Sequence, residues 1–406
     1  MSAYVTRLHA FNAIINISHI LLVRAVNWLL LLFGRYYSPV SNVFLHLSLN
    51  KCMDFKALLG SEVAKIDAAI IAFLDGRTYA KEDAFVSHYY QLIKDYIMAG
   101  GKRMRPFLLV QAYKGFAKNP SENIYRPSTC VEFLHNASLI HDDIIDRDDT
   151  RRGNPAFHFL FKKFYIDSKF AFATPEHYGT TMGILGGDST FFLGLEALQA
   201  SFPAALNEKA IALYCKAYHE ICDGVLMEMN FVQVPSVTEA QYMKMVSLKT
   251  GALIEKSLLI GATYGEASED SKALLSTYAI NLGKAFQIKD DILGTFGDAQ
   301  KTGKPTDGDI KDGKKTLLLL KAIEKAKAVD KAFLKKTLGQ PGITADQVDK
   351  VRKIFKDSGA EDYCARKIAE HSDMANVAND KLGNVMKTEQ KDALKALVKY
   401  NLDRDK

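Results

Sequence analysis

The chain has 406 residues, of which 48% are apolar and 25% charged, so it can bury a large core. Its 53 basic and 47 acidic residues give a formal charge of +6, spread along the whole chain, and this balance argues against a nucleic-acid partner. The five cysteines are scattered and never spaced as Cys-x-x-Cys, which excludes a disulfide scaffold and indicates free thiols in a reducing compartment such as the cytoplasm.

Residues 1–53 contain no Asp or Glu, although the whole chain has 47 acidic residues. The apolar run Phe11–Phe33 is long enough to span a bilayer, but polar residues interrupt it, and Arg24 would cost about 2.5–3.5 kcal/mol at the bilayer centre. Three interpretations stay open: a helix that associates peripherally with a membrane, an acid-free organelle transit peptide, or a non-native stretch ahead of a translation start at Met53. We therefore separate this extension from a folded domain over 54–406.

Helical periodicity dominates the chain from residue 54 onward, and alternating strand patterns are almost absent. Apolar residues recur at three- and four-residue steps in the ranges 57–74, 192–232, 242–262 and 273–293. Turn residues separate helical stretches, but no linker rich in Pro, Gly or Ser divides them. The sequence therefore predicts one all-α domain. It also predicts peripheral, lysine-rich helices from about Thr316 and an extended lid or surface loop over 153–188.

Three cations lie at a glycine turn in residues 100–106, which read GGKRMRP. Pro106 is tolerated in the first turn of a helix, so we expect this turn to open one. Guanidinium groups such as that of Arg105 bind diphosphate oxygens in bidentate fashion, and Lys102 adds an ammonium group. The simpler alternative is a basic turn on the protein surface.

The first acidic segment, residues 141–153, reads HDDIIDRDDTRRG and follows the apolar helical run 131–140. Asp142 and Asp146 are four residues apart, so they lie on the same face of a helix. Like charges at this spacing repel each other unless a cation lies between them, and Mg²⁺ prefers carboxylate oxygens in a shell completed by water and phosphate. The segment predicts one wall of a magnesium site, although a single Asp-Asp pair is more often a solvated helix end.

A second acidic segment, residues 286–294, reads FQIKDDILG and again lies at the end of an apolar helix. Gln287 precedes Asp290 by three residues and Asp291 by four, so it shares their face. The loop over 303–316 is rich in glycine and lysine, so its backbone can approach a phosphate and its ammonium groups can bind one. Two such segments, each followed by a glycine-containing basic loop, indicate magnesium–diphosphate chemistry.

In combination, these motifs resemble those of the trans-isoprenyl diphosphate synthases, the family of farnesyl, geranylgeranyl and longer polyprenyl diphosphate synthases. The resemblance extends from Lys56 to Lys325 and rests on GGKRMRP, HNASLIHDDIIDRDDTRRG, LKTGA, FQIKDDILG and TGKP…DGKKT, in this order. It implies the isoprenoid synthase fold, a single bundle of long antiparallel helices around a central cavity, with the acidic motifs facing each other across its mouth. It also implies a homodimeric prenyltransferase that condenses isopentenyl diphosphate with an allylic diphosphate.

The resemblance also implies roles for individual residues. The implied ligands of two or three Mg²⁺ ions are Asp142, Asp143, Asp146, Asp290 and Asp291. The positions that match contacts to isopentenyl diphosphate are Lys102, Arg105, His135 and Arg152. Those that match contacts to the allylic diphosphate are Arg151, Lys249, Lys304 and Lys314. Thr250 and Gln287 match positions that flank the allylic carbon and, with Lys249, are the implied catalytic residues. Gly294 departs from the family, because many members carry a third Asp there.

The length of the product depends on the floor of the cavity. In the family, bulky aromatic residues four and five positions before the first aspartate shorten the product, and here these positions hold the small residues Ser138 and Ala137. They lie about one turn deeper than the first aspartate. Small side chains leave the tunnel open and predict geranylgeranyl diphosphate or a longer product, unless Phe191 or Phe192 closes it instead.

Three other functions fit the sequence less well. A terpene cyclase or head-to-head prenyl synthase needs no second diphosphate site of the kind that Lys102 and Arg105 indicate. A non-catalytic partner subunit would be expected to lose aspartates of the first motif, which are all present. A metal phosphohydrolase built on His141 and Asp142 lacks further spaced histidines and carboxylates. We therefore predict a cytoplasmic prenyltransferase, with a peripheral membrane contact through residues 1–53 as an open alternative.

Overall fold

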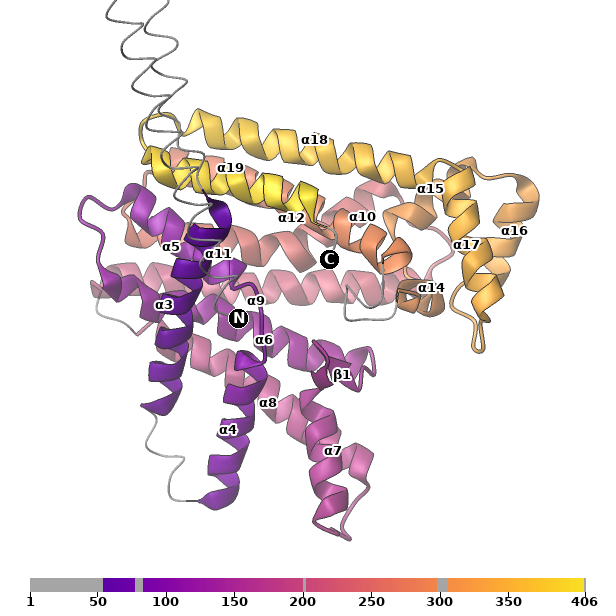
Figure 1. Ribbon diagram of the computed structural model, residues 1–406, viewed down its shortest axis with the longest axis horizontal. Coiled ribbons are helices and arrows are strands. Elements are labelled where there is room, and N and C mark those ends of the chain that lie inside the picture. Colours follow the sequence, from indigo (N-terminus) through magenta and orange to yellow (C-terminus); the bar gives the residue numbers. More distant parts are fainter. Residues whose placement is uncertain (1–53, 77–82, 200–201, 298–305, 405–406) are drawn as a thin grey trace, which may run out of the picture. The chain divides into compact units, whose positions relative to one another are not determined.

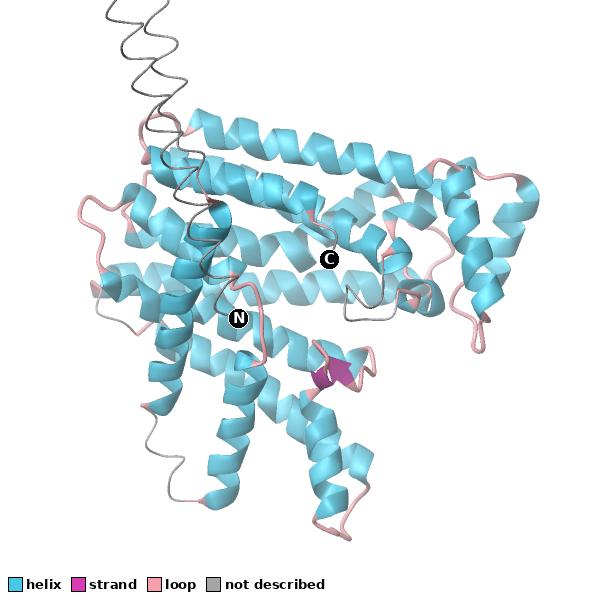
Figure 2. Cartoon of the chain, viewed as in Figure 1, coloured by secondary structure: helices cyan, strands magenta, loops and turns pink. Residues whose placement is uncertain are grey.

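Helices make up almost all secondary structure in the computed structural model, which describes residues 54–76, 83–199, 202–297 and 306–404 (Figures 1 and 2). Residues 1–53 and Lys304 lie outside the described residues. The long helices are α3 (Phe55–Asp75), α4 (Ala84–Met98), α5 (Met104–Phe116), α6 (Tyr125–Ile145), α8 (Pro175–Ala197), α9 (Ala204–Gln233), α11 (Ala252–Tyr264), α12 (Glu269–Phe296), α17 (Ala345–Asp357), α18 (Ala360–Lys381) and α19 (Thr388–Asp403). The shorter ones are η2 (Glu122–Ile124), α7 (Phe157–Asp167), α10 (Glu239–Val246), η3 (Ser247–Gly251), α14 (Gly308–Asp312), α15 (Leu317–Lys325) and α16 (Ala328–Thr337).

Helix α6, which carries the first acidic motif, packs against α3, α5, α7, α8 and α11 (Figure 1). It is buried on nearly all sides from Tyr125 to Ile140, which is typical of a core helix. Its buried polar side chains donate hydrogen bonds to carbonyls of the preceding turn, as Ser128 does to Tyr125 (2.7 Å) and Asn136 does to Glu132 (2.8 Å). Toward its C-terminal end α6 becomes partly exposed, at His135, Ser138 and Leu139 and then in the turn that carries the first acidic motif, so this end of the helix can face a cavity.

Helix α12, which carries the second acidic motif, packs against α11, α18 and α19 (Figure 1). Gly283 lets it approach the turn η3 closely, because a Cβ at this position would lie 2.6 Å from Gly251 Cα. On α9, Gly224 has the same effect, since a Cβ there would lie 2.4 Å from Lys249 N. These two glycines therefore allow η3 to pack tightly against both α9 and α12.

Residues 153–188 do not form the extended lid or loop that we predicted. A short antiparallel hairpin, β1 (Thr150–Arg151) with β2 (Asn154–Pro155), is followed by helices α7 and α8. Helix α7 forms because Phe157, Phe161 and Tyr165 recur at four-residue steps and bury one face of it, and α7 packs against α8. The prediction was wrong because the many aromatic residues have helical spacing, which favours a packed helix over a loop.

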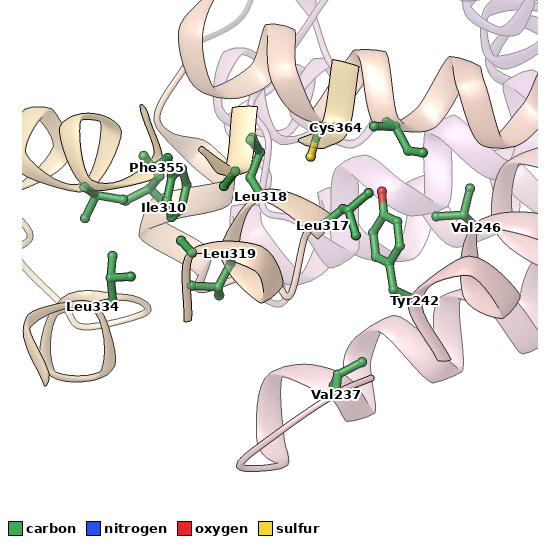
Figure 3. Close-up of a cluster of buried hydrophobic side chains, with 14 of the residues drawn as sticks. Val237, Tyr242, Val246, Ile310, Leu317, Leu318, Leu319, Leu334, Phe355 and Cys364 are labelled. Atoms are coloured by element: carbon green, nitrogen blue, oxygen red, sulfur yellow. The ribbon is translucent and has the colours of Figure 1, made fainter. Parts of the chain in front are cut away.

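The C-terminal helices contribute a core of their own and are more than the peripheral layer that we predicted. Helices α10, α14, α15, α17 and α18 bury a cluster that includes Tyr242, Ile310, Leu317 and Phe355 (Figure 3). Helix α18 runs beside α12, and α19 packs against α3, α5 and α12 (Figure 1). Among the described helices, none combines the length and the apolar character that crossing a membrane requires.

Candidate active site

A cavity of about 540 Å³ is lined by both acidic motifs. Asp146 comes from the end of α6, and Asp290 and Asp291 come from α12. Glu228 of α9 and Lys249 of η3 line the same cavity. The remaining polar residues of its lining come from the turn and hairpin after α6, from α10, from α12 and from the segment around α14: Asp148, Thr150, Tyr242, Gln287, Thr306, Asp309, Asp312, Lys314, Lys315 and Thr316. Two motifs that are far apart in the sequence thus meet at one cavity.

The first acidic motif divides its three aspartates between the cavity and the core. Asp146 is the C-cap residue of α6 and lines the cavity, and Asp142, one turn earlier, is also partly exposed. Asp143 is fully buried, and its carboxylate accepts hydrogen bonds from Tyr96 (2.9 Å) and from Nε of Arg151 (2.6 Å). Asp142 and Asp146 are therefore better placed to bind a metal than Asp143. The carboxylate of Asp143 instead holds the side chain of Arg151 in place through their hydrogen bond.

The second acidic motif is held by a short hydrogen-bond network. Asp291 is buried and accepts hydrogen bonds from Tyr242 (2.6 Å) and from Gln287 (2.9 Å). Burial raises the pKa of Asp291 to about 8, and the nearby Asp309 adds to this rise. Thr250 of η3 donates a hydrogen bond to Gln287 (2.6 Å), so this implied catalytic pair lies together beside the motif.

Asp290 faces a group of basic residues. Its carboxylate pairs with Arg404, which also donates to the carbonyl of Phe286 (3.1 Å) and lies 3.8 Å from the centre of that ring. Burial raises the pKa of Asp290, and the nearby positive charges of Arg404, Lys102 and Arg105 act in the opposite direction. The second motif therefore borders the basic glycine turn as well as the cavity.

Lys314 connects the two walls of the cavity. Its Nζ lies 3.7 Å from Asp146 Oδ2 and 3.7 Å from Asp309 Oδ1, and α14, which carries Asp309, packs against α12. Burial acts to lower the pKa of Lys314, but these two carboxylates outweigh burial and the pKa is raised. A single ammonium group is thus in ion-pair range of carboxylates from both walls.

Lys249 occupies η3, a single turn of π-helix between α10 and α11. Such turns are rare and are found frequently at functional sites, since they reorient side chains within a helix. Lys249 forms an ion pair with Glu228, whose charge raises the pKa of Lys249 against the effect of burial. From this one irregular turn, Lys249 therefore lines the cavity, and Thr250 is hydrogen-bonded to Gln287, which also lines it.

The glycine turn 100–106 needs its glycines for conformational reasons. Gly100 and Gly101 have φ angles of 127° and 136°, which other residues rarely adopt. Arg152 donates a hydrogen bond to the carbonyl of Gly100, so the two basic segments lie against each other. Arg103 is buried in ion pairs with Asp67 (2.7 Å) and Glu132 (2.8 Å), so it stabilises the turn and is not available to a ligand.

Lys102, Arg105 and His135 remain as ligand-binding candidates at this turn. Lys102 is exposed and lies 5.3 Å from the centre of the Tyr400 ring. Arg105 Nε is buried and has no hydrogen-bond partner within the described residues, which is unusual for a buried donor. Burial lowers the pKa of His135 far below its usual value, and Arg105 and Arg152 lower it further, so His135 is neutral near pH 7.

The residues expected to set product length lie deeper along α6. Ala137 is 2% exposed and Ser138 is partly exposed, with its hydroxyl bonded to the carbonyl of His135 (2.8 Å). Phe192 is 60% exposed, so it does not close a buried tunnel. Phe191 packs against Tyr218 with ring centres 4.4 Å apart, which leaves it as the alternative floor residue.

Four residues at the site were not predicted from the sequence. Glu228 pairs with Lys249, Tyr242 donates to Asp291, Asp309 lies beside Lys314, and Arg404 pairs with Asp290. All four residues lie outside the quoted sequence motifs, so the spacing of residues within those motifs does not indicate them. A signal was present for Asp309, because it lies in the loop rich in glycine and lysine that we expected to bind phosphate.

The donor set at the cavity fits magnesium. Within residues 54–76, 83–199, 202–297 and 306–404, no group of three His, Cys, Asp or Glu side chains could hold a metal ion unaided. Mg²⁺ is commonly bound through one or two carboxylates, with water and substrate phosphates completing its shell. Asp146 on one wall and Asp290 on the other match this mode of binding, since they are hard oxygen donors at one cavity.

Comparisons with known proteins agree with this geometry. The model of the polyprenyl synthetase family matches residues 86–357. A short chain isoprenyl diphosphate synthase of Methanocaldococcus jannaschii is 34% identical over 282 residues, 70% of this chain and 80% of that protein. A geranylgeranyl diphosphate synthase of Saccharolobus solfataricus is 33% identical over 313 residues, 76% and 88% of the two chains.

Solved structures extend the similarity to the whole helical fold. The geranylgeranyl pyrophosphate synthase of Corynebacterium glutamicum, complexed with isoprenyl diphosphate and magnesium, superposes with a TM-score of 0.78 at 26% identity, over 84% of this chain and 97% of that one. The all-α fold and the motifs therefore define a prenyltransferase. The chain belongs to the polyprenyl synthetase family and is a polyprenyl diphosphate synthase, which confirms the predicted fold and enzyme class.

Proposed function

We propose that this enzyme condenses isopentenyl diphosphate with an allylic diphosphate and releases all-trans geranylgeranyl diphosphate or a longer polyprenyl diphosphate. The observation that supports this most directly is the position of Lys314, 3.7 Å from Asp146 and 3.7 Å from Asp309. A cavity with carboxylates on two walls and cations between them suits a diphosphate that is bound through divalent ions.

The allylic diphosphate is held at the acidic walls. Asp142 and Asp146 would bind two of the two or three Mg²⁺ ions, and Asp290 would bind another. When bound, Mg²⁺ supplies the charge that stabilises the departing diphosphate. Lys249 and Lys314 would contact the same diphosphate, because both lie beside this cavity and both remain protonated.

Isopentenyl diphosphate is held at the glycine turn. Lys102 and Arg105 would bind its diphosphate, and the buried Arg105 Nε gains the hydrogen-bond partner that it otherwise lacks. His135 would contribute a hydrogen bond without a charge, because its pKa is far below neutral. Arg152, which is bound to the carbonyl of Gly100, would complete this second diphosphate site.

The bond-forming step then needs positioning more than a protein nucleophile. Departure of the diphosphate leaves an allylic cation, which the double bond of isopentenyl diphosphate attacks. The Thr250–Gln287 pair would lie beside this cation and orient it through their oxygen atoms. The attack forms a carbon–carbon bond and leaves a cation on the isopentenyl unit. A proton is then lost from the carbon beside this cation, which restores a double bond, and the released pyrophosphate accepts that proton. The longer product can move to the allylic site for another cycle.

We propose a homodimer as the working assembly. Helices α8 and α9 carry large apolar side chains that are exposed in the single chain: Ile184, Leu185, Phe192, Leu226 and Met229. Such side chains on long helices are typical of a surface that is covered by another protein. Light scattering should give twice the mass of the 45.2 kDa chain.

We also propose a cytoplasmic enzyme that contacts a membrane peripherally through residues 1–53. The acid-free, apolar composition of this segment supports the proposal, and so does the apolar nature of the product. Partition of the full chain onto vesicles, compared with a chain that lacks residues 1–53, tests it.

The decisive experiment is incubation with labelled isopentenyl diphosphate, Mg²⁺ and one allylic primer at a time. The dephosphorylated products are then separated by chromatography. We expect label in alcohols of geranylgeranyl length or longer. Products no longer than farnesol would contradict the proposed length, and a cyclic or head-to-head product without label would contradict the reaction.

The first wall is tested by replacing Asp142. Asp142→Ala removes a carboxylate from a partly exposed position, so the fold should persist while turnover falls by about 100-fold or more. Circular dichroism and the same assay measure both effects. Full turnover in this variant would show that Asp142 holds no metal needed for the reaction.

A further inference from the structure

By the family resemblance, position 294 is where many members carry a third aspartate of the second acidic motif, and α12 has a glycine there instead. The structure shows what lies at this position instead. A Cβ built on Gly294 would be 3.3 Å from Oδ2 of Asp309, and no other atom lies within 4 Å apart from the helix's own backbone and the chain neighbours. Both residues line the cavity. The carboxylate of Asp309 therefore lies close to where the side chain of an aspartate at position 294 would begin.

The position of Asp309 is held by its neighbours in α14. Ile310, the next residue, is 2% exposed and is part of the buried cluster in Figure 3, so it anchors α14 against the C-terminal helices. The side chain of Asp309 is 26% exposed, and its other oxygen, Oδ1, lies 3.7 Å from Lys314. One oxygen thus faces Gly294 and the other faces the lysine between the walls.

Gly294 and Asp309 depend on each other sterically. A Cβ at position 294 would be in tight contact with the carboxylate of Asp309, which would have to give by a few tenths of an ångström. The glycine therefore makes room for a carboxylate that comes from a different element. The chain loses a charge on α12 and regains one from α14 at nearly the same place.

We propose that Asp309 supplies the third carboxylate of the second metal-binding wall, taking the role left open by Gly294. The inference rests on the proposed metal-dependent condensation and adds a ligand to that same site. Asp309 would hold a divalent ion, directly or through one of its waters, together with Asp290 and the substrate diphosphate. Hard oxygen donors of this kind are what Mg²⁺ requires.

The test measures metal binding separately from turnover. Mn²⁺ is titrated into the protein in the presence of inorganic pyrophosphate, and free Mn²⁺ is read by electron paramagnetic resonance. We expect Asp309→Asn to weaken Mn²⁺ binding by roughly 10- to 100-fold and to raise the Mg²⁺ concentration that half-saturates turnover. The double variant Gly294→Asp/Asp309→Asn should recover most of the binding, because it returns the carboxylate to α12.

Asp307→Asn is the matched control. It removes one negative charge two residues away, but the side chain of Asp307 pairs with Lys311 (2.7 Å) and does not line the cavity. It should therefore leave Mn²⁺ binding unchanged. Equal binding by the Asp309→Asn and Asp307→Asn variants would overturn the proposal, and so would a double variant no better than Asp309→Asn.

Two further measurements keep the outcome clear. If Asp309→Asn does not fold, as judged by circular dichroism, Fe²⁺ and ascorbate can cleave the wild-type backbone near the bound metal. Cuts in both 290–294 and 306–312 are expected, and cuts confined to 290–294 would refute the role of Asp309. Wild-type protein that incorporates no isopentenyl diphosphate would refute the proposed function, whereas active wild type with unaltered binding in Asp309→Asn would refute this inference alone.

Discussion

The surroundings of Asp291 change the pKa of its carboxyl group. Its side chain is almost fully buried, with hydrogen bonds from Tyr242 and Gln287 to its two oxygens. Burial raises its pKa to about 8, far above the usual value for an aspartate. Without a metal ion, the ionised form is therefore costly near neutral pH, and a cation nearby would remove this cost.

This shift predicts how the stability of the metal-free protein depends on pH. Because the folded-state pKa of Asp291 lies above the unfolded value, the folded state binds more protons between about pH 4 and 8, and this group lowers stability as pH rises through that window. Asp291→Asn removes the effect. In the presence of a chelator, the melting temperature of Asp291→Asn minus that of the wild type should therefore increase from pH 5 to pH 8.5. Circular dichroism measures both melting temperatures. A constant difference across this range would contradict the assignment.

The floor of the cavity can be tested by a single residue on α6. Ala137 is 2% exposed, and the family resemblance implies that it borders the floor of the product tunnel, so a phenylalanine there would take up space that the growing chain needs. We expect Ala137→Phe to shorten the main product by at least one isoprene unit, as measured by chromatography of the alcohols. Phe192→Ala, at a position that is 60% exposed, is the control and should leave the product unchanged. An identical product spectrum in both variants would show that Ala137 does not border the floor of the cavity, and Phe191 would be the next candidate.

At the scale of elements, the site depends on how closely helices approach the π-helical turn η3. Turn η3 carries Lys249, which lines the cavity, and Thr250, and Gly224 on α9 and Gly283 on α12 make room for this turn. A larger side chain at either glycine would destabilise the fold, because the atoms it would meet are backbone atoms that cannot move aside easily. Packing against two helices therefore fixes the direction in which both side chains point.

Two glycine-to-alanine substitutions should have opposite effects. In Gly224→Ala, the new Cβ would lie 2.4 Å from Lys249 N, so we expect a loss of about 1–3 kcal/mol in the free energy of unfolding and a loss of turnover. In Gly60→Ala on α3, nothing lies within 4 Å of the new Cβ, so we expect a gain of about 1 kcal/mol from helix propensity and unchanged turnover. Denaturant unfolding measures both. Equal stabilities would show that α9 can move away from η3.

At the scale of the molecule, the described helices within residues 54–404 pack against one another and bury their apolar side chains among themselves. Helix α19 packs against both α5 and α12, so the end of the chain joins the helix that follows the glycine turn to the helix of the second motif. Through Arg404, the same end reaches Asp290. Residues Asp54–Lys406 form one compact unit by their internal contacts.

This arrangement predicts that the catalytic domain does not need residues 1–53 to fold. A chain that begins at Met53 should unfold at the same temperature as the full chain and should retain its turnover in solution. Differential scanning calorimetry and the labelled-substrate assay measure the two properties. A large drop in melting temperature would show that the extension is part of the folded core.

The sequence by itself was sufficient for the family and the helical class, and it located the two acidic motifs that the structure brings to one cavity, because these depend on local patterns. The four-residue spacing of Asp142 and Asp146 sets their common face on any helix, and the motif around Asp290 follows the same rule. The pair Gly100-Gly101 likewise predicts a turn, and its φ angles are ones that few other residues can adopt.

The tertiary structure decided which atoms of those residues face the cavity and what accompanies them. Asp143 belongs to the same motif as Asp142, yet Tyr96 and Arg151 hold its carboxylate in the core. Asp309 lies beside Gly294 because α14 packs against α12. Such contacts join residues that are distant in sequence, and they arise from the packing of whole helices, which no local spacing encodes.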